Sequence, residues 1–368
     1  GELIAEPASG ARQRRSLRRL IAPVVVAALI VVVGTILIEK RRSGSRPAVY
    51  VPRPITGSIG QEMDINWSPE SVFMAYGLTR EGSADVMIQP VAGGEAQLLA
   101  GGPGTQTSPR WSPDGKYLAY VSSSEEGTPV LIAPRHGGAP RRLIETNIRT
   151  LDLDKMGSSM GDRPWAVNGG SILVSRADDS GRTALYRVDR DTGDAQQLTF
   201  PAPGSMDLYP SYSFDGERIV FQRRRNGKGE LLVMPAAGGE PKVLLADEFD
   251  NIMPAWRPDN RRILFLSDRR GTSGANVFEI DVEGGAPTQL TFETNHVCAL
   301  SVSADNRVAY VPFWHVTVLC SVVVASGERW QVSARSLSSY GAGFAAGGRA
   351  GVWRWARAGD GGGGGGCV

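Results

Sequence analysis

The sequence repeats one short phrase at nearly regular intervals, and this repeat restricts the possible folds more than any other feature. Clear copies read PRWSPDGKYLAYVS, PSYSFDGERIVFQ and PAWRPDNRRILFLS, and looser copies stand between and around them. Aligned on one anchor position, successive copies are 44, 54, 47, 44 and 46 residues apart; the anchors are Trp67, Trp111, Trp165, Tyr212, Trp256 and Val302. A period in the forties with strands inside each unit is typical of β-propeller blades.

Each unit also contains the turns that a blade of four strands requires. Asp114-Gly115 and Asp215-Gly216 follow the anchor and tolerate the positive φ of tight hairpin turns. An apolar run such as residues 117–121 then predicts a buried central strand, and a second glycine turn such as Gly93-Gly94 precedes a short outer strand. The pattern predicts an all-β fold, a six-bladed β-propeller over residues 61–313. We expect the last blade to be incomplete, because the phrase breaks off after Val311.

The third unit carries an insertion from Ile148 to Asp162, which lengthens it to 54 residues. Loop insertions in propellers shape a binding face in some cases and are neutral surface loops in others. The sequence leaves both interpretations open.

Residues 21–38 form an uncharged apolar run without a polar face. As a helix the run would span about 27 Å, close to the thickness of the hydrocarbon core of a bilayer. We therefore expect one transmembrane α-helix before the propeller; the alternatives are a cleaved signal peptide and a buried core helix. Arginines before the run slightly outnumber the basic residues after it, which favours a cytoplasmic N-terminus and a propeller outside the cytoplasm.

The remaining segments complete a prediction of five parts. Residues 1–20 are expected to be a basic cytoplasmic linker, and residues 39–60 a juxtamembrane linker. Residues 314–368 keep neither the period nor the turns and end in a glycine run. They are interpreted as an irregular tail, a frame-shift product or disordered, with a flexible binding tail as the alternative. The chain begins with Gly1, so we expect a fragment of a larger protein, unless the start is processed or engineered.

The composition of the chain argues against nucleic-acid binding, a disulfide framework and a metal site. The chain has 40 basic and 38 acidic residues, so the near-zero net charge gives no support for a nucleic-acid partner. Cys298, Cys320 and Cys367 match no metal pattern and are odd in number, which argues against a disulfide framework. We expect no cofactor and no metal site.

The phrases WSPDGxxLAYVS and GGxPxxL resemble the repeats of bacterial TolB-like propellers of the WD type, over about residues 61–312. The order of basic linker, single span and propeller is similar to the C-terminal half of bacterial membrane sensors. In these sensors a winged-helix or kinase domain precedes the span. The resemblance implies an extracytoplasmic propeller that binds a protein or small-molecule ligand on one face. The fold alone assigns no function.

A catalytic role is not expected. Similar repeats precede the hydrolase domain of prolyl-oligopeptidase-like peptidases, but that chemistry needs a G-x-S-x-G elbow followed by Asp and His. The sequence GTSGAN at Gly271 has the wrong spacing. His136 and His296 are interpreted as surface or structural residues, and His315 falls in the irregular tail. No catalytic residue is predicted.

Two kinds of charged cluster have a structural and a functional interpretation. Carboxylates could hold Ca²⁺, although Asp also favours turns for geometric reasons alone. Basic residues that follow the central strands of two units could form a docking patch or be ordinary solvated loop charge. The acidic clusters are Asp152 with Asp154 and Asp189 with Asp191 and Asp194; the basic residues are Arg223, Arg224, Arg225, Arg269 and Arg270.

The sequence leaves two main hypotheses for the function of the chain. The first is a membrane-tethered binding module, the sensor portion of a signalling protein. The second is an accessory or scaffold propeller of the cell envelope. A third possibility is the propeller part of a truncated peptidase. The ligand itself is not readable from the sequence.

Overall fold

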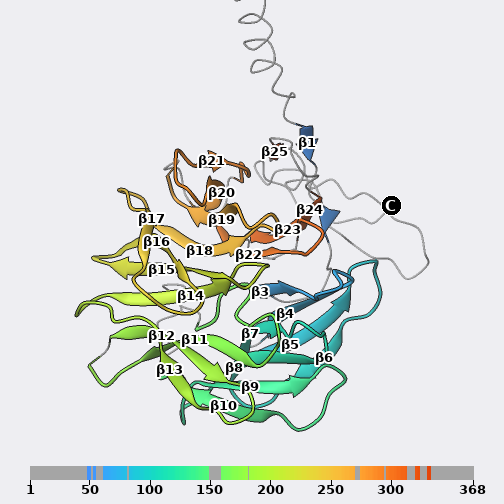
Figure 1. Ribbon diagram of the computed structural model, residues 1–368. Coiled ribbons are helices and arrows are strands. Elements are labelled where there is room, and N and C mark those ends of the chain that lie inside the picture. The colour runs from blue at the N-terminus through green and yellow to red at the C-terminus, as the bar shows by residue number, and fades with distance from the viewer. Residues whose placement is uncertain are drawn as a thin grey trace, which may run out of the picture. The chain divides into compact units, whose positions relative to one another are not determined.

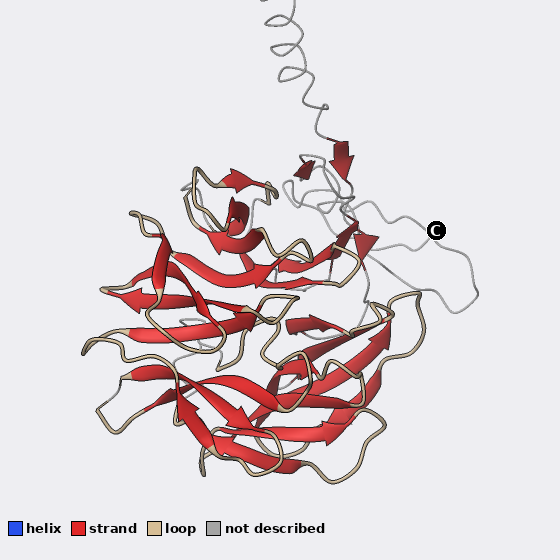
Figure 2. Ribbon diagram, viewed as in Figure 1, coloured by secondary structure: helices blue, strands red, loops and turns tan. Residues whose placement is uncertain are grey.

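The computed structural model describes residues 48–50, 53–54, 61–80, 83–148, 159–180, 182–269, 274–293, 296–312, 320–323 and 330–332. Every regular element in these ranges is a strand (Figures 1 and 2). None of the described residues belongs to a helix long and apolar enough to cross a membrane. The predicted membrane helix at 21–38 lies outside the described residues, as do Asp152, Asp154, Arg270, His315 and Cys367.

The strands follow one another in antiparallel groups that match the sequence repeat. The first two groups are β3 (Gln61–Trp67), β4 (Phe73–Arg80), β5 (Ser83–Pro90) and β6 (Gln97–Ala100), then β7 (Thr105–Trp111), β8 (Tyr117–Ser123), β9 (Pro129–Pro134) and β10 (Arg141–Glu145). The next two are β11 (Ser171–Ala177), β12 (Thr183–Asp189) and β13 (Ala195–Gln197), then β14 (Met206–Tyr212), β15 (Arg218–Arg225), β16 (Lys228–Pro235) and β17 (Lys242–Leu245). The last two are β18 (Asn251–Trp256), β19 (Arg262–Ser267), β20 (Asn276–Asp281) and β21 (Thr288–Gln289), then β22 (Val297–Val302), β23 (Arg307–Pro312) and β24 (Cys320–Val323). In four of the groups the second strand, which carries the apolar run, is buried along most of its length: β4, β8, β15 and β19.

Core clusters lie between neighbouring groups, where the anchor aromatics fill the space. Trp256 packs with Val220 of the preceding group, and Trp67 packs with Ala309 and Val311 of the last group. The second contact joins residues at opposite ends of the described chain, so the sheets form a closed ring (Figure 1). This is a β-propeller, and the predicted all-β propeller fold is confirmed.

A strand from before the first repeat completes the last sheet. Strand β2 (Arg53–Pro54) pairs with β24, so that the order in this sheet is β2-β24-β23-β22. Strand β24 lies beyond the predicted end of the propeller at residue 313, within the segment interpreted as an irregular tail. The sheet therefore contains more than the expected first half of a blade. Strands β1 (Ala48–Tyr50) and β25 (Trp330–Val332) form a separate two-stranded sheet.

The innermost strands share a distortion that no turn phrase predicts. Each has a register shift, for example between Thr107 and Arg110 in β7 and between Leu208 and Ser211 in β14. Bulges of this kind bend a strand and redirect its side chains. In four units the shift includes the third residue before the anchor, and φ is positive there: Asp64, Ser108, Tyr209 and Met253.

Candidate functional site

A small cavity lies on the central axis of the ring, at the level of these bulges. Its walls come from the innermost segments of the repeats, including Asp64, Arg110, Asp162, Tyr209 and Met253. Asp162 also lies three residues before its anchor, as Asp64, Tyr209 and Met253 do. One position of the repeat therefore supplies much of the cavity wall. We call this space the channel cavity.

Asp162 crosses the channel and connects three repeats. Its Oδ1 accepts hydrogen bonds from Ser301 Oγ at 2.6 Å and from Asn66 Nδ2 at 3.1 Å. Its Oδ2 accepts the backbone N–H of Val302 at 3.2 Å. Burial raises the pKa of Asp162, although the Ser301 hydrogen bond and the positive charge of Arg110 act in the opposite direction. Asp162 thus holds the third repeat against the first and the sixth.

Arg110 is the buried cation of the channel. Its guanidinium donates to the backbone carbonyls of Gly161, Met160 and Pro109. Burial lowers the pKa of Arg110, and the charges of Asp64 and Asp162 counteract this shift. Burial likewise raises the pKa of Asp64. The three charged groups form one desolvated cluster, in which the two carboxylates offset the cost of burying the guanidinium.

Gly161 lets the end of the insertion enter the channel. A Cβ at this residue would lie 2.5 Å from the carbonyl oxygen of Pro210 and 2.6 Å from that of Tyr209. The Gly161 N–H donates to the same Pro210 oxygen at 3.2 Å. Backbone therefore packs directly on backbone here, and no side chain fits between the two segments.

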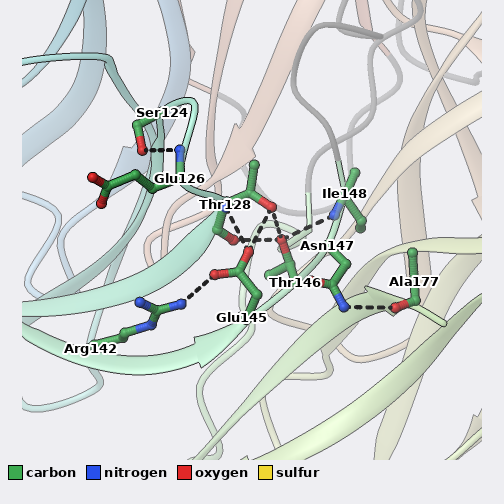
Figure 3. A network of polar contacts seen from close by, with 9 residues as sticks. All are labelled: Ser124, Glu126, Thr128, Arg142, Glu145, Thr146, Asn147, Ile148 and Ala177. Atoms are coloured by element: carbon green, nitrogen blue, oxygen red, sulfur yellow. Dashed lines mark hydrogen bonds and ion pairs between the residues drawn. The ribbon is translucent and has the colours of Figure 1, made fainter. Parts of the chain in front are cut away.

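The start of the insertion is held by a separate polar network (Figure 3). Glu145 Oε1, at the end of β10, accepts the Thr128 N–H at 2.6 Å, and Arg142 Nη2 donates to Glu145 Oε2 at 2.6 Å. Thr146 Oγ1 donates to the Thr128 carbonyl at 2.7 Å, and the Ala177 N–H of β11 donates to the Thr146 carbonyl at 2.9 Å. The inserted segment is therefore fastened where it leaves the second repeat and again at Asp162.

A wider pocket opens at the end of the channel where the first hairpin turns of the repeats lie. We call it the turn-face pocket. Turn residues such as Pro69 and Pro113 form its rim. Aromatic and charged residues also line it: Trp67, Trp111, Trp165, Phe214, Asp162 and Arg163. Arg163 stacks on Phe214, with its guanidinium carbon 3.8 Å from the ring centroid, a geometry that favours a cation–π attraction.

The predicted basic cluster does not present free positive charge. Arg223 makes a bidentate pair with the fully buried Asp207, at 2.7 and 2.8 Å. The other described arginines of the cluster also have carboxylates within 4 Å: Arg224 with Asp250, Arg225 with Glu230, and Arg269 with Asp247. Their charge is compensated locally, so the structure favours the interpretation as ordinary loop charge.

The acidic turn at Asp189 is organised by its own hydrogen bonds. Asp189 Oδ1 accepts the N–H groups of Asp191 and Thr192, both at 2.9 Å, and Asp194 Oδ2 accepts Thr192 Oγ1 at 2.8 Å. The hydrogen bonds from the Thr192 and Asp191 N–H groups lower the pKa of Asp189. No group of three or more His, Cys, Asp or Glu side chains is placed to hold a metal ion within the part of the chain that the structure describes.

The two described histidines and the described thiol have structural surroundings. His136 is exposed beside its glycine turn. His296 Nδ1 accepts the Ala275 N–H at 2.9 Å, and burial lowers the pKa of its ring. Cys298 donates to the Val311 carbonyl, and burial raises the pKa of its thiol to about 12. Cys320 lies in β24.

Sequence reasoning missed the residues that meet in the channel. The alignment of the repeats contains a pattern that could have predicted them. Polar residues stand one position before the anchor in several units, as in Asn66, Arg110, Ser211 and Ser301. Their side chains bond a neighbouring segment: Asn66 Oδ1 accepts the Trp111 N–H of the next repeat at 2.9 Å, and Ser211 Oγ accepts the Arg163 N–H of the preceding repeat at 3.2 Å.

The ring of repeated antiparallel sheets around the channel cavity defines the protein as a β-propeller. The model of the TolB β-propeller domain matches residues 50–222 and 202–336, most of the chain. The chain belongs to this family, and the expected TolB-like identity of the propeller is confirmed. The match continues past the predicted boundary at 313 and includes the sequence of β24 and β25.

Relatives with curated names match a shorter part of the chain. Tol-Pal system protein TolB from Anaeromyxobacter sp. (strain K) and from Anaeromyxobacter dehalogenans (strain 2CP-1) are each 35% identical over 95 residues. These residues are 25% of this chain and 22% of each relative. The chain thus matches about a fifth of the length of these relatives.

Solved structures share the fold at low identity. The putative TolB from Agrobacterium tumefaciens aligns with a TM-score of 0.54 at 21% identity, over 64% of this chain and 83% of its own. TolB from Acinetobacter baumannii aligns with a TM-score of 0.51 at 18% identity, over 74% of this chain and 66% of its own. The tricorn protease aligns with a TM-score of 0.53 at 16% identity, over 69% of this chain and 24% of its own. At these identities the likeness establishes the fold alone.

Proposed function

We propose that this chain is a membrane-tethered, six-bladed propeller that binds a protein partner at the turn-face pocket and catalyses no reaction itself. The observation that carries the proposal is the pocket, in which three tryptophans, Phe214 and Arg163 surround an opening at the channel mouth. Tryptophan and arginine are the residues most enriched among the binding hot spots of protein interfaces. Membership of the TolB family supports a protein partner, because the named relatives belong to a Tol-Pal system.

The membrane part of the proposal rests on the sequence. The apolar run at 21–38 is long enough to cross a bilayer, and the basic residues before it favour a cytoplasmic N-terminus. The propeller then lies outside the cytoplasm, as the sensor module of a larger signalling protein. A scaffold propeller of the cell envelope is the alternative, and an in-frame cytoplasmic domain encoded upstream would decide between them.

The binding face can be tested by site-specific photo-crosslinking in the native host. A photoreactive amino acid at Pro113 places the probe at the rim of the turn-face pocket. The control position, Asn226, lies on the β15–β16 turn at the other end of the strands. We expect one discrete crosslinked protein from position 113 and none from position 226. Identical patterns from both positions, or no product from position 113, would overturn the proposal.

The membrane anchor is tested by fractionation. The full chain should stay with membranes after alkaline carbonate extraction, and a variant without residues 21–38 should be released. Alkaline phosphatase joined after residue 60 should be active only if that point lies outside the cytoplasm. Release of the full chain, or an inactive fusion, would contradict the anchor or its orientation respectively.

A further inference from the structure

The sequence contains two Asn-Gly pairs, Asn168-Gly169 and Asn226-Gly227. In such a pair the backbone nitrogen of the second residue can attack the side-chain amide carbon of the first, and glycine has no side chain that would hinder the attack. Both pairs lie in turns, the first after the anchor of the third repeat and the second between β15 and β16. Because the two pairs have the same covalent structure, a difference in their reactivity comes mainly from the fold.

The first pair is held in place by hydrogen bonds. The Gly169 N–H donates to the Ala166 carbonyl at 2.8 Å, and Asn168 Oδ1 accepts the Gly170 N–H at 2.9 Å. Gly169 is also buried, although Asn168 is exposed. For the Gly169 nitrogen to reach the amide carbon, the peptide group and the side chain must both rotate, and this rotation breaks the two bonds. The fold therefore protects this pair.

The second pair has no such restraint. Asn226 and Gly227 are both exposed, and a Cβ at Gly227 would meet no atom within 4 Å. Among the described residues, neither the Asn226 side chain nor the Gly227 N–H makes a hydrogen bond. Their φ angles of 51° and 78° and the pairing of Arg225 with Lys228 define a two-residue hairpin turn of type I′. The peptide group between Asn226 and Gly227 lies outside the ladder, so it can rotate while the strands stay paired.

We propose that Asn226 is a site of spontaneous deamidation in the folded protein, whereas Asn168 is protected. The Gly227 nitrogen forms a bond to Asn226 Cγ, and the bond between Cγ and the side-chain nitrogen breaks. That nitrogen leaves as ammonia, with the proton of the Gly227 amide, and a succinimide ring remains. Water then opens the ring at either carbonyl and gives aspartate or isoaspartate. The only reactant besides the protein is water.

Positive charge around Asn226 favours the first step. The attack requires that the Gly227 nitrogen lose its proton, and a nearby cation stabilises the negative charge that develops. Arg225 and Lys228 flank the pair and are exposed. The carboxylate of Glu230, 3.7 Å from Arg225, compensates only part of this charge. The tip of the hairpin therefore combines an unrestrained amide with a basic environment.

The two products differ in their effect on the hairpin. Aspartate adds a negative charge between Arg225 and Lys228 and leaves the backbone unchanged. Isoaspartate also lengthens the backbone by one carbon atom, because the chain then passes through the former side chain. The two-residue turn can no longer hold Arg225 opposite Lys228. We therefore expect faster hydrogen exchange at the tip of β15 and β16 with isoaspartate, and not in the variant Asn226→Asp.

Peptide mapping by mass spectrometry tests the site. The full chain in detergent is incubated at pH 8 and sampled over several weeks. We expect the peptide that contains Asn226 to acquire the mass increase of an amide-to-acid conversion. The peptide that contains Asn168 should convert at least about tenfold more slowly, because two hydrogen bonds must break first. The same chain kept in urea is the control, and there both pairs should convert at similar rates.

A variant confirms the assignment. Asn226→Gln keeps an amide but moves it one carbon further from the backbone, so acid formation at this position should stop while the conversion at Asn168 is unchanged. Labelling by an isoaspartate-specific methyltransferase should fall with it. Equal rates at the two pairs in the folded protein would overturn the proposal. So would an unchanged Asn226 after a time in which the chain in urea has converted.

Discussion

At the scale of single residues, the channel depends on a few side chains whose role is defined by position in the repeat. Asp162 lies at the end of an insertion, and the sequence alone allows a neutral surface loop there. In the folded chain it is buried and accepts hydrogen bonds from the first and sixth repeats. The same residue lines both the channel cavity and the turn-face pocket. Asp162 therefore couples the structure of the ring to the surface where we propose that ligands bind.

Replacing Asp162 with Ala should destabilise the protein strongly. The change leaves Asn66, Ser301 and the Val302 N–H without their acceptor and removes a carboxylate near Arg110. We expect the free energy of unfolding to fall by about 3 kcal/mol, as for other broken buried networks. Urea denaturation measures this, with the exposed Asp191→Ala as the matched control, expected within about 0.5 kcal/mol of the unsubstituted protein. Equal stabilities of the two variants would show that the network contributes nothing.

Cys298 should be chemically silent in the folded protein. Because burial raises the pKa of its thiol to about 12, almost no thiolate is present at neutral pH. In a protein with Cys320→Ser and Cys367→Ser, iodoacetamide at pH 8 should modify Cys298 only after unfolding in urea. Alkylation at equal rates in the native and the unfolded protein would contradict the burial.

The same shift gives a stability effect with a defined sign. The folded protein keeps the Cys298 proton at a pH where the unfolded chain, with the ordinary thiol pKa of 9.0, loses it. The folded state then binds more protons, so stability falls as the pH rises from about 9 towards 12. Cys298→Ser should lose less stability over this range, measured by urea denaturation at each pH. A parallel decline in both proteins would exclude Cys298 as the cause.

At the scale of elements, much of the fold could be predicted, because turns and apolar runs are local signals. The Asp114-Gly115 and Asp215-Gly216 turns occur where expected, and the runs after them form β8 and β15. The bulges of the innermost strands could not be predicted in this way, since the residues with positive φ include Tyr209 and Met253 rather than glycines. Tertiary packing around the axis imposes that conformation, and the site lies on it.

Gly161→Ala tests how tightly the end of the insertion packs. The added Cβ would meet two backbone carbonyl oxygens at 2.5 and 2.6 Å, and backbone atoms yield little. We expect a loss of about 3 kcal/mol in the free energy of unfolding, at the upper end for overpacking. Gly170→Ala is the control, because its nearest neighbour is a side-chain oxygen of Asn168 at 3.3 Å. If the two variants unfold at the same urea concentration, the close approach at Gly161 is not present.

At the scale of the whole molecule, the ring is closed by strands from both ends of the propeller. The sequence predicted a broken last unit because the turn phrase ends near Val311, whereas β24 pairs with β23 without that phrase. The partner of β24 is β2, more than 260 positions earlier in the sequence, a pairing that no local pattern reveals. Because this closure joins segments far apart in the sequence, we expect the stability of the ring to depend on the two ends remaining together.

A disulfide across the closure tests this arrangement. Pro54 is the register partner of Cys320 in the pairing of β2 with β24, so Pro54→Cys places two cysteines opposite each other in neighbouring strands, within the usual range for a disulfide. Mild oxidation should link residues 54 and 320, and the cross-link should raise the thermal unfolding midpoint because it restricts the unfolded chain. Arg53→Cys is the matched control: residue 53 pairs with Ser321, and this variant should form the bond to Cys320 much more slowly. Equal rates of cross-linking at positions 53 and 54 would contradict the register, and a disulfide that leaves the midpoint unchanged would mean that the closure does not limit the stability of the ring.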